Sequence, residues 1–253
     1  MVHIVGAGCG AADLITLRGK RLLEEADLIV YAGSLVNPEL LLSFARPDCA
    51  LLDSAKMTLE EIVAAVQAAE TAGKTTVRLH SGDPSLYGAI GEQMREFDRL
   101  GIPYDITPGV SSFAGAAAAL KTEYTLPGVS QSVIITRAAG RTPVPEGEEL
   151  RSFAAHGATM ALFLSTGLLG QVTEELTAGG YPPSTPAAIV YKASWPDERV
   201  FRCTLGTLEE TAEENHITKT ALIVVGGVLD ESFERSKLYD PSFETEFREA
   251  EKT

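Results

Sequence analysis

The residues best suited to chemistry form a glycine-rich segment, Gly6-Ala7-Gly8-Cys9-Gly10-Ala11, which follows a short apolar run near the amino terminus. The spacing formally satisfies the G-x-G-x-x-G/A pattern, in which bare backbone approaches the pyrophosphate of a dinucleotide. In dinucleotide-binding folds the helix opens at the glycines, and an acidic residue follows the second strand about 20 residues further on. Here we expect the helix to begin only at Thr16, and the second strand ends in Ala32-Gly33-Ser34 without an acid. Asp27 precedes that strand and therefore lies at its opposite end.

This context leaves three interpretations of the first loop. It is a tight turn with only a structural role, a site for a nicotinamide dinucleotide, or a loop that binds a different nucleoside. The missing acidic residue argues against the dinucleotide. Similar loops at other strand ends argue against a purely structural turn, so the sequence favours a different nucleotide-like cofactor.

Four other predicted strand ends carry glycine, proline or small polar residues: Ala32-Gly33-Ser34-Leu35, Asp53-Ser54-Ala55-Lys56, Ser81-Gly82-Asp83-Pro84 and Thr107-Pro108-Gly109-Val110-Ser111-Ser112. In open α/β sheets, ligands bind outside the carboxyl ends of the strands, so we expect these loops to converge on one cleft. The carboxylate of Asp83 suits either a ribose or its own turn, and the sequence leaves both roles open. One of Ser111 and Ser112 is suited to cap the alanine-rich helix expected over 113–120, while the other faces the cleft.

Alternating strands and helices are expected to position these loops. Short β-branched runs alternate with amphipathic segments of about 10 to 14 residues, which is typical of βαβ units around a mostly parallel sheet. Asn37-Pro38 supplies an N-cap and a first-turn proline, and Thr58-Leu59-Glu60-Glu61 is a capping box. We expect strands near residues 2–5, 27–31, 50–52, 75–80 and 103–107.

A second series of elements begins after residues 124–130. We expect strands near 133–136, 159–164, 187–192, 199–204 and 221–226, with helices near 148–155, 168–178 and 207–215. The turn at 194–198 is too short for a helical crossover, so its two strands should be antiparallel and the second sheet mixed. The sequence therefore predicts an α/β protein with an amino-terminal domain over 1–122, a carboxyl-terminal domain over 123–230 and a charged extension over 231–253.

Composition argues against several classes of partner. With 21 basic against 35 acidic residues, the net charge of −14 repels the phosphates of nucleic acid. No run approaches the roughly 18 to 20 apolar residues that cross a bilayer, and the amino terminus lacks the pattern of a signal peptide, so we expect no membrane association. The three cysteines, Cys9, Cys49 and Cys203, show no disulfide or zinc spacing and are expected to be reduced thiols of a cytoplasmic protein. Motifs for nucleophilic hydrolysis, phosphoryl transfer and zinc chemistry are missing from the sequence, and we expect no metal site.

Motifs along nearly the whole chain resemble the tetrapyrrole methylase family. The family pattern is carried by Val5-Gly6-Ala7-Gly8-Cys9-Gly10, Asp13-Leu14-Ile15-Thr16, Ser81-Gly82-Asp83-Pro84 and Pro108-Gly109-Val110-Ser111-Ser112. Five segments are similar to the subgroup that methylates carbon 11 of precorrin-4 or cobalt-precorrin-4: Tyr31-Ala32-Gly33-Ser34-Leu35-Val36, residues 79–88, Gly140-Arg141-Thr142-Pro143, Ala193-Ser194-Trp195-Pro196-Asp197-Glu198 and Ser236-Lys237-Leu238-Tyr239-Asp240-Pro241.

The resemblance implies two αβα domains with S-adenosylmethionine in a cleft between them, a homodimer, and a trough for the tetrapyrrole. It places the cofactor contacts on Cys9, Gly82, Asp83, Ser111, Ser112, Leu164 and Ala193. One departure is that Cys9 and Ala11 stand where family members usually carry proline and aspartate. A proton-abstracting role for that aspartate cannot apply here, so we expect catalysis to depend on positioning, with no single indispensable base.

A polycarboxylate substrate must be neutralised locally by a protein of such negative charge. Our hypothesis is that Ser34 and its loop contact the tetrapyrrole, with Lys56, Arg137, Arg141 and Lys192 as candidate partners of its carboxylates. Three alternatives stay open: a tetrapyrrole methyltransferase acting at another ring position, a nicotinamide-dependent oxidoreductase, and a cofactor-binding module without catalysis.

Overall fold

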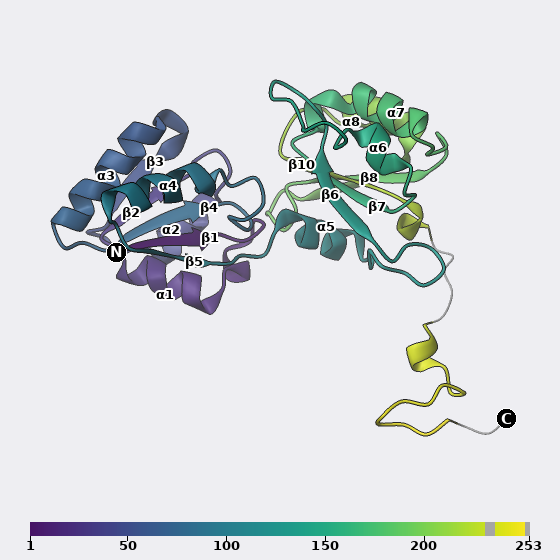
Figure 1. Ribbon diagram of the computed structural model, residues 1–253, viewed down its shortest axis with the longest axis horizontal. Helices are drawn as coiled ribbons and strands as arrows, with labels where there is room; N and C mark the ends of the chain where they lie inside the picture. Colours follow the sequence, from purple (N-terminus) through teal and green to yellow (C-terminus); the bar gives the residue numbers. More distant parts are fainter. Residues whose placement is uncertain (231–235, 251–253) are drawn as a thin grey trace. The chain divides into compact units, whose positions relative to one another are not determined.

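Two five-stranded sheets organise the protein, each in its own compact unit (Figure 1). The structure is a computed structural model that describes residues 1–230 and 236–250. Unit 1 comprises Met1–Ala116 together with Lys192–Glu198, and unit 2 comprises Ala117–Tyr191 and the described chain from Arg199 onward. A short segment from the second half of the sequence thus belongs to unit 1. The expected domain limits at 122/123 and 230/231 stay a prediction.

The sheet of unit 1 is entirely parallel, with strand order β3-β2-β4-β1-β5. Its strands are β1 (Val2–Gly6), β2 (Leu28–Tyr31), β3 (Ala50–Asp53), β4 (Thr76–His80) and β5 (Tyr104–Thr107). Each lies within a residue or two of its predicted position. Because all five strands run in the same direction, the loops that follow them leave from one edge of the sheet.

Helices cover both faces of this sheet, and their starts follow the capping signals in the sequence. Helices α1 (Leu17–Glu25) and α2 (Pro38–Phe44) pack on one face, and α3 (Leu59–Thr71) and α4 (Ile90–Leu100) pack on the other. Thr16 caps α1 by accepting a hydrogen bond from Gly19 N at 3.0 Å, and Thr58 closes the predicted capping box with Glu61. The predicted helix starts at Thr16, Asn37 and Thr58 are confirmed.

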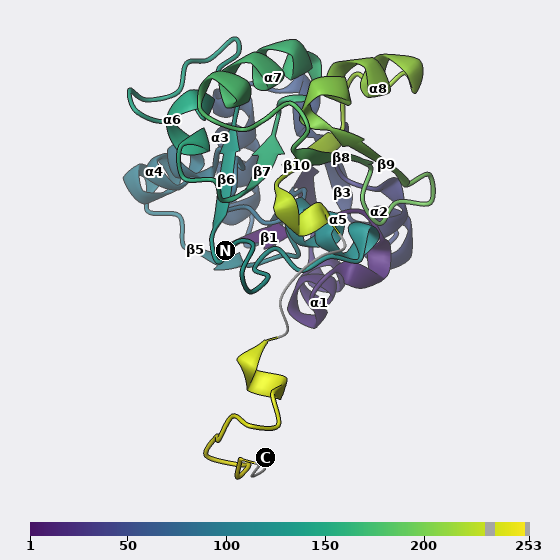
Figure 2. The same ribbon diagram turned by 90° about the vertical axis from the view of Figure 1, so that its right-hand side faces the viewer.

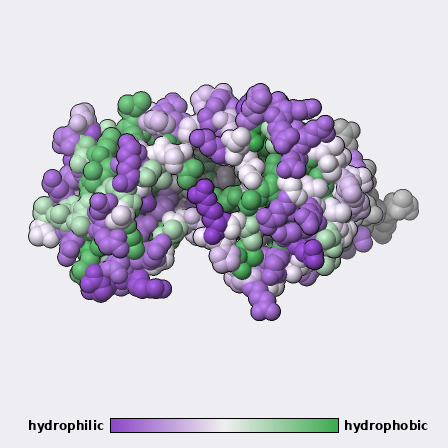
Figure 3. All heavy atoms as spheres, turned by 90° about the horizontal axis from the view of Figure 1, so that it is seen from above, coloured by the Kyte–Doolittle hydropathy of each residue, from purple (hydrophilic) through white to green (hydrophobic). Residues whose placement is uncertain are grey.

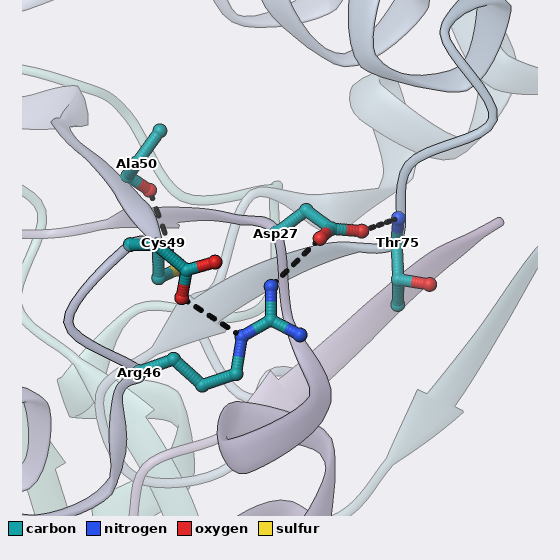
Figure 4. Close-up of polar contacts among 6 residues, drawn as sticks. Asp27, Arg46, Cys49, Ala50 and Thr75 are labelled. Carbon is teal, nitrogen blue, oxygen red and sulfur yellow. Dashed lines mark hydrogen bonds and ion pairs between the residues drawn. The ribbon is translucent and has the colours of Figure 1, made fainter.

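At the amino-terminal edge of the sheet, Asp27 ties three segments together (Figure 4). Its carboxylate accepts a hydrogen bond from Thr75 N at 2.8 Å and forms an ion pair with Arg46 at 2.8 Å. The hydrogen bond from Thr75, followed by the one from Arg46, lowers the pKa of Asp27 below its usual value. Asp27 therefore serves this edge of the sheet, away from the loops at the carboxyl ends.

Replacing Asp27 with alanine should lower the midpoint of thermal unfolding at about pH 7. Since the folded-state pKa is depressed, the carboxylate stabilises the fold above about pH 4, and this contribution is lost as the pH falls through the folded pKa. Melting curves between about pH 7 and pH 3 should show the difference from wild type shrinking in acid. The exposed Asp48, paired with Arg46 at 3.2 Å, supplies the control Asp48→Ala, with a smaller effect. A difference that does not change with pH would contradict this role.

The sheet of unit 2 is mixed, as predicted, with strand order β6-β7-β10-β8-β9. Its strands are β6 (Val133–Arg137), β7 (Thr159–Phe163), β8 (Pro186–Tyr191), β9 (Arg199–Thr204) and β10 (Ala221–Val225). Strands β6 and β7 are parallel, whereas β8 and β9 form the expected antiparallel pair. The carboxyl ends of β6 and β7 therefore lie side by side.

Three helices, α6 (Leu150–Ala154), α7 (Leu169–Ala178) and α8 (Leu208–Glu214), enclose an apolar core on one face of this second sheet (Figure 2). Helix α5 (Ser112–Leu120) contains the point where the chain passes from unit 1 to unit 2. Short 3-10 turns occupy Ala12–Leu14, Ser54–Lys56, Thr166–Leu168, Leu205–Thr207, Gly227–Leu229 and Lys237–Tyr239. The last of these turns lies in the predicted charged extension, of which residues 231–235 and 251–253 fall outside the described residues.

Hydrophilic side chains are spread over the face of both units seen in Figure 3, with apolar residues among them. Cys9, Cys49 and Cys203 are free thiols. Across residues 1–230 and 236–250, no helix has both the length and the apolar character that crossing a membrane requires. The same residues contain no cluster of three or more histidine, cysteine or carboxylate side chains arranged to hold a metal ion.

Candidate functional site

The loops after β1 and β4 are joined by backbone hydrogen bonds beyond the ends of the strands. Ala7 N donates to His80 O at 2.7 Å, and the backbones of Gly8 and Gly82 exchange bonds of 3.2 and 2.8 Å. Gly8 and Gly82 have φ values of +83° and +62°, which favour glycine because a side chain is strained there. The first part of the glycine loop, Ala7 and Gly8, is therefore fixed to the end of β4 and to Gly82.

The loop after β5 packs against the same two loops so closely that only glycine fits. A Cβ on Gly6 would lie 2.6 Å from the Cα of Gly109, and a Cβ on Gly109 would lie 2.2 Å from the carbonyl oxygen of Gly82. Ser111 and Ser112 follow directly, and a Cβ on Gly82 would lie 3.6 Å from the Cα of Ser111. Three of the five predicted loops are thus brought together by backbone contacts.

Asp83 ties two of these loops together through its carboxylate. One oxygen accepts a hydrogen bond from Gly109 N at 2.9 Å, while the other accepts from the backbone N of Ser85 at 2.9 Å and from the Ser85 hydroxyl. Partial burial alone would raise the pKa of Asp83, but the hydrogen bonds from Ser85 and Gly109 together lower it. The carboxylate is therefore an ionised brace of the β4 and β5 loops.

The segment Lys192–Glu198 completes this edge of unit 1, although it lies far away in the sequence. The hydroxyl of Ser194 accepts a hydrogen bond from Ala11 N at 3.0 Å and lies 3.2 Å from the sulfur of Cys9. A Cβ on Gly10 would lie 2.2 Å from Cδ1 of Trp195, so the first loop and the indole are in close contact. Sequence reasoning missed this role of Ser194.

Two predicted cofactor contacts, Cys9 and Ala193, lie close together beside α5. A Cβ on Gly115 would lie 2.8 Å from the sulfur of Cys9 and 3.4 Å from the Cβ of Ala193. Cys9 and Ala193 are both buried. Six of the seven residues predicted to contact the cofactor therefore belong to these adjoining segments of unit 1.

The seventh, Leu164, lies in unit 2 directly after β7. Its φ of +53° is unusual for leucine, and the residue is 68% exposed. The buried hydroxyl of Ser165 donates to Phe163 O at 2.7 Å and accepts from Ala138 N at 2.9 Å. Leu164 is therefore fastened to the loop that follows β6 and contains Arg141.

The four basic candidates for substrate binding differ in how far they are already engaged. Arg137 donates to Ala138 O, Thr142 O and Pro143 O at 3.2, 3.1 and 2.7 Å, so its guanidinium organises the loop around Arg141. Arg141 itself is exposed and forms no ion pair within the described chain. Lys192 pairs with Asp197 at 2.6 Å, and the side chain of Lys56 is 83% exposed.

His80, at the end of β4, is buried together with Arg78 on the face of the sheet that α3 and α4 cover. Burial, with a smaller contribution from the charge of Arg78, lowers the pKa of His80 to about 3, so the imidazole is neutral. Arg78 donates to Gln93 Oε1 at 2.9 Å, and Gln93 in turn donates to Ala89 O at 3.1 Å. This buried chain of hydrogen bonds anchors the far end of the loop that contains Asp83.

A separate hollow of about 440 Å³ lies in unit 2, beside α6 and α7. Its lining residues are Glu149, Arg151, Ser152, Gln171, Glu174 and Glu175. Three glutamates against one arginine make it unsuited to an anionic ligand, and it contains none of the predicted site residues.

Comparison with known proteins finds relatives along almost the whole chain. The family model for tetrapyrrole (corrin/porphyrin) methylases matches residues 1–209. The chain is 52% identical over 252 residues to cobalt-precorrin-4 C(11)-methyltransferase of Methanocaldococcus jannaschii, covering 99% of this chain and 97% of that protein.

Two solved structures share the fold. The X-ray structure of a cobalt precorrin-4 methyltransferase, a cobalamin biosynthetic enzyme, superposes with a TM-score of 0.88 at 46% identity, covering 90% of this chain and 95% of its own. Uroporphyrin-III C-methyl transferase from Thermus thermophilus, complexed with S-adenyl homocysteine, gives a TM-score of 0.75 at 27% identity, covering 92% and 95%. The residues matched by the family model, 1–209, make up most of the chain and include its glycine loops. The chain therefore belongs to the tetrapyrrole (corrin/porphyrin) methylase family.

Proposed function

We propose that this protein transfers a methyl group from S-adenosylmethionine to carbon 11 of precorrin-4 or cobalt-precorrin-4, a step of cobalamin biosynthesis. The observation that carries the proposal is 52% identity to a cobalt-precorrin-4 C(11)-methyltransferase along almost the full length of both chains. The solved relative with bound S-adenyl homocysteine, the product that remains after methyl transfer, supports the identity of the methyl donor.

The joined loops of unit 1 suit S-adenosylmethionine in both shape and charge. The donor carries a cationic sulfonium, and segments 6–11, 81–85, 108–112 and 193–195 contain no lysine or arginine that would repel it. Their one charged residue is Asp83, whose ionised carboxylate contributes a favourable negative field. We assign the contacts with the donor to Cys9, Gly82, Asp83, Ser111, Ser112 and Ala193 in unit 1 and to Leu164 in unit 2.

Positioning accounts for most of the catalysis we infer. The sulfonium supplies an electrophilic methyl group, so the protein mainly has to align a nucleophilic ring carbon with that methyl and the sulfur. Alignment of this kind contributes roughly 7 to 11 kcal/mol, whereas a general base contributes a factor of about 10² to 10⁴. Ala11 offers no proton acceptor in the first loop, and its backbone N is already bound to Ser194. Rigid, mutually braced loops are what such a mechanism requires.

The basic candidates take different roles towards the carboxylates of the substrate. Arg141 is exposed on a loop that Arg137 holds in shape, so we assign the direct contact to Arg141 and a supporting role to Arg137. Ser34 and Lys56 follow β2 and β3 and belong to the substrate side in the same proposal. The pairing of Lys192 with Asp197 offsets its charge and makes it the weakest of the four basic candidates.

Turnover with methyl-labelled S-adenosylmethionine tests the proposal directly. Purified protein is given precorrin-4 and cobalt-precorrin-4 in parallel, and NMR of the product locates the ¹³C-labelled methyl group. We expect label on carbon 11, and the faster substrate then shows whether cobalt is already in the ring. Label at another ring position would support a different tetrapyrrole methyltransferase. Donor binding without transfer would support a non-catalytic module, and enhanced NADH fluorescence on mixing would support the oxidoreductase.

We also infer a homodimer in the cytoplasm, which rests on the family resemblance. Sedimentation of the full chain at several concentrations measures the assembly. A mass twice that of the 26.9 kDa chain is expected, and a monomer at all concentrations would contradict the homodimer.

A further inference from the structure

The turn that carries Ser34 is braced from the neighbouring strand by Asp53. Asp53 ends β3 and is the register partner of Tyr31, which ends β2. Its Oδ1 accepts hydrogen bonds from Gly33 N at 2.9 Å and from Ala55 N at 3.0 Å. The hydroxyl of Ser54 donates to Tyr31 O at 3.0 Å. Asp53 and Ser54, at the end of β3, therefore hold the backbone at the end of β2 and in the turn that follows it.

Only glycine at position 33 leaves enough room for the carboxyl group of Asp53. A Cβ at this position would lie 2.5 to 2.6 Å from all three atoms of the Asp53 carboxyl group. Gly33 is not among the residues with positive φ, so its backbone conformation is open to other residues. The glycine in the Ala32-Gly33-Ser34-Leu35 segment is thus explained by the close approach of Asp53.

The other end of the turn is anchored by Asn37 to the first glycine loop. Asn37 is buried, and its amide donates to Gly10 O at 3.0 Å. The backbone N atoms of Leu35 and Val36 donate to Ala32 O at 2.9 and 3.0 Å. Among residues 32–37, Ser34 and Leu35 are the exposed ones. The anchors therefore present one hydroxyl and one apolar side chain to a ligand.

We propose that Asp53 is a positioning residue that fixes the Ser34–Leu35 turn against the tetrapyrrole substrate. The inference rests on the proposed function for the identity of that substrate. A free carboxylate beside a polycarboxylate would repel it, but the charge of Asp53 is turned inward onto two backbone N–H groups and lies 4.0 Å from Lys56 Nζ. The residue acts through Gly33 and does not itself need to touch the substrate.

Steady-state kinetics of Asp53→Ala and Asp53→Asn test this role. Alanine removes both hydrogen bonds and should raise the KM for the tetrapyrrole about tenfold, the scale of a lost hydrogen bond to a charged group, with little change in kcat. Asparagine keeps Oδ1 as an acceptor and should stay within about threefold of wild type. Affinity for S-adenosylhomocysteine, followed by the fluorescence of the single tryptophan Trp195, should not change in either variant. Asp48→Ala, at the opposite edge of the sheet, is the matched control.

A double-mutant cycle with Gly33→Ala adds a steric test. Gly33→Ala alone should raise the KM about as much as Asp53→Ala, because the new methyl group displaces the carboxylate. In the Asp53→Ala background the space is free, and Gly33→Ala should add no more than about twofold. Fully additive effects would overturn the proposal, as would an asparagine variant as impaired as the alanine variant.

Amide exchange separates failure of this inference from failure of the proposed function. Asp53→Ala should accelerate hydrogen exchange at Gly33 whether or not the protein turns over a tetrapyrrole. Unchanged exchange at Gly33 would show that the brace does not exist. Faster exchange with an unchanged KM would overturn the positioning role while leaving the proposed function intact, and a wild-type protein without turnover would refute the proposed function alone.

Discussion

Replacement of Gly109 by alanine is expected to reduce the affinity for S-adenosylhomocysteine about 10- to 100-fold, the scale of roughly one or two hydrogen bonds lost at the displaced loops. The added Cβ would lie 2.2 Å from the carbonyl oxygen of Gly82 and 2.8 Å from the Cα of Gly6. Both neighbours are backbone atoms of the joined loops, so the clash cannot be relieved by a side-chain rotation. We also expect a loss of roughly 1 to 3 kcal/mol in the free energy of unfolding, as for overpacked interiors.

Gly91→Ala provides the matched control for Gly109→Ala. Gly91 lies in α4, and a Cβ there would meet no atom within 4 Å. Alanine is the better helix former by up to about 1 kcal/mol, so this variant should bind S-adenosylhomocysteine like wild type and be equally or more stable. Calorimetry and chemical denaturation measure both quantities. If Gly109→Ala bound as tightly as Gly91→Ala, the close approach of the three loops would not contribute to donor binding.

Local signals in the sequence predicted the elements of the fold well. The capping box at Thr58 joins residues only three positions apart, and the short turn at 194–198 decides the antiparallel pairing of its strands without knowledge of the rest of the chain. Such signals lie within a few residues of each other, and physical rules about caps and turns apply to them directly.

The braces of the candidate site could not be predicted in this way, because their partners are distant in the sequence. Ser194 binds Ala11 across 183 positions, and Asp53 binds Gly33 across 20 positions and two strands. Serine and aspartate at strand ends are ordinary turn residues, so neither position carries a signal of its own. Gly33 carried no clearer signal, because a sequence does not show whether a glycine serves the backbone of a turn or the close approach of a distant side chain.

Arg137 and Arg141 should respond differently to the same substitutions, if one supports the loop and the other binds the substrate. Arg141→Ala should raise the KM for the tetrapyrrole about 10- to 100-fold, the scale of a lost charge-assisted hydrogen bond. Arg141→Lys should restore part of this loss, because a point charge still attracts a carboxylate. Arg137→Lys should be nearly as impaired as Arg137→Ala, since an ammonium group cannot replace a planar guanidinium that reaches three carbonyl oxygens.

Salt dependence then distinguishes direct contact with the substrate from support of the loop. The effect of Arg141→Ala should shrink as ionic strength rises, because the lost attraction is exposed and screened, whereas the effect of Arg137→Ala should persist. Arg151→Ala, which removes an exposed arginine of unit 2 from beside three glutamates, controls for the change in net charge. An unchanged KM in the Arg137→Ala, Arg141→Ala double variant would show that the carboxylates are bound elsewhere. If the KM does rise, the two arginines together explain how a protein of net charge −14 accepts a polycarboxylate substrate. Arg137 organises the loop, and Arg141 on that loop binds a carboxylate.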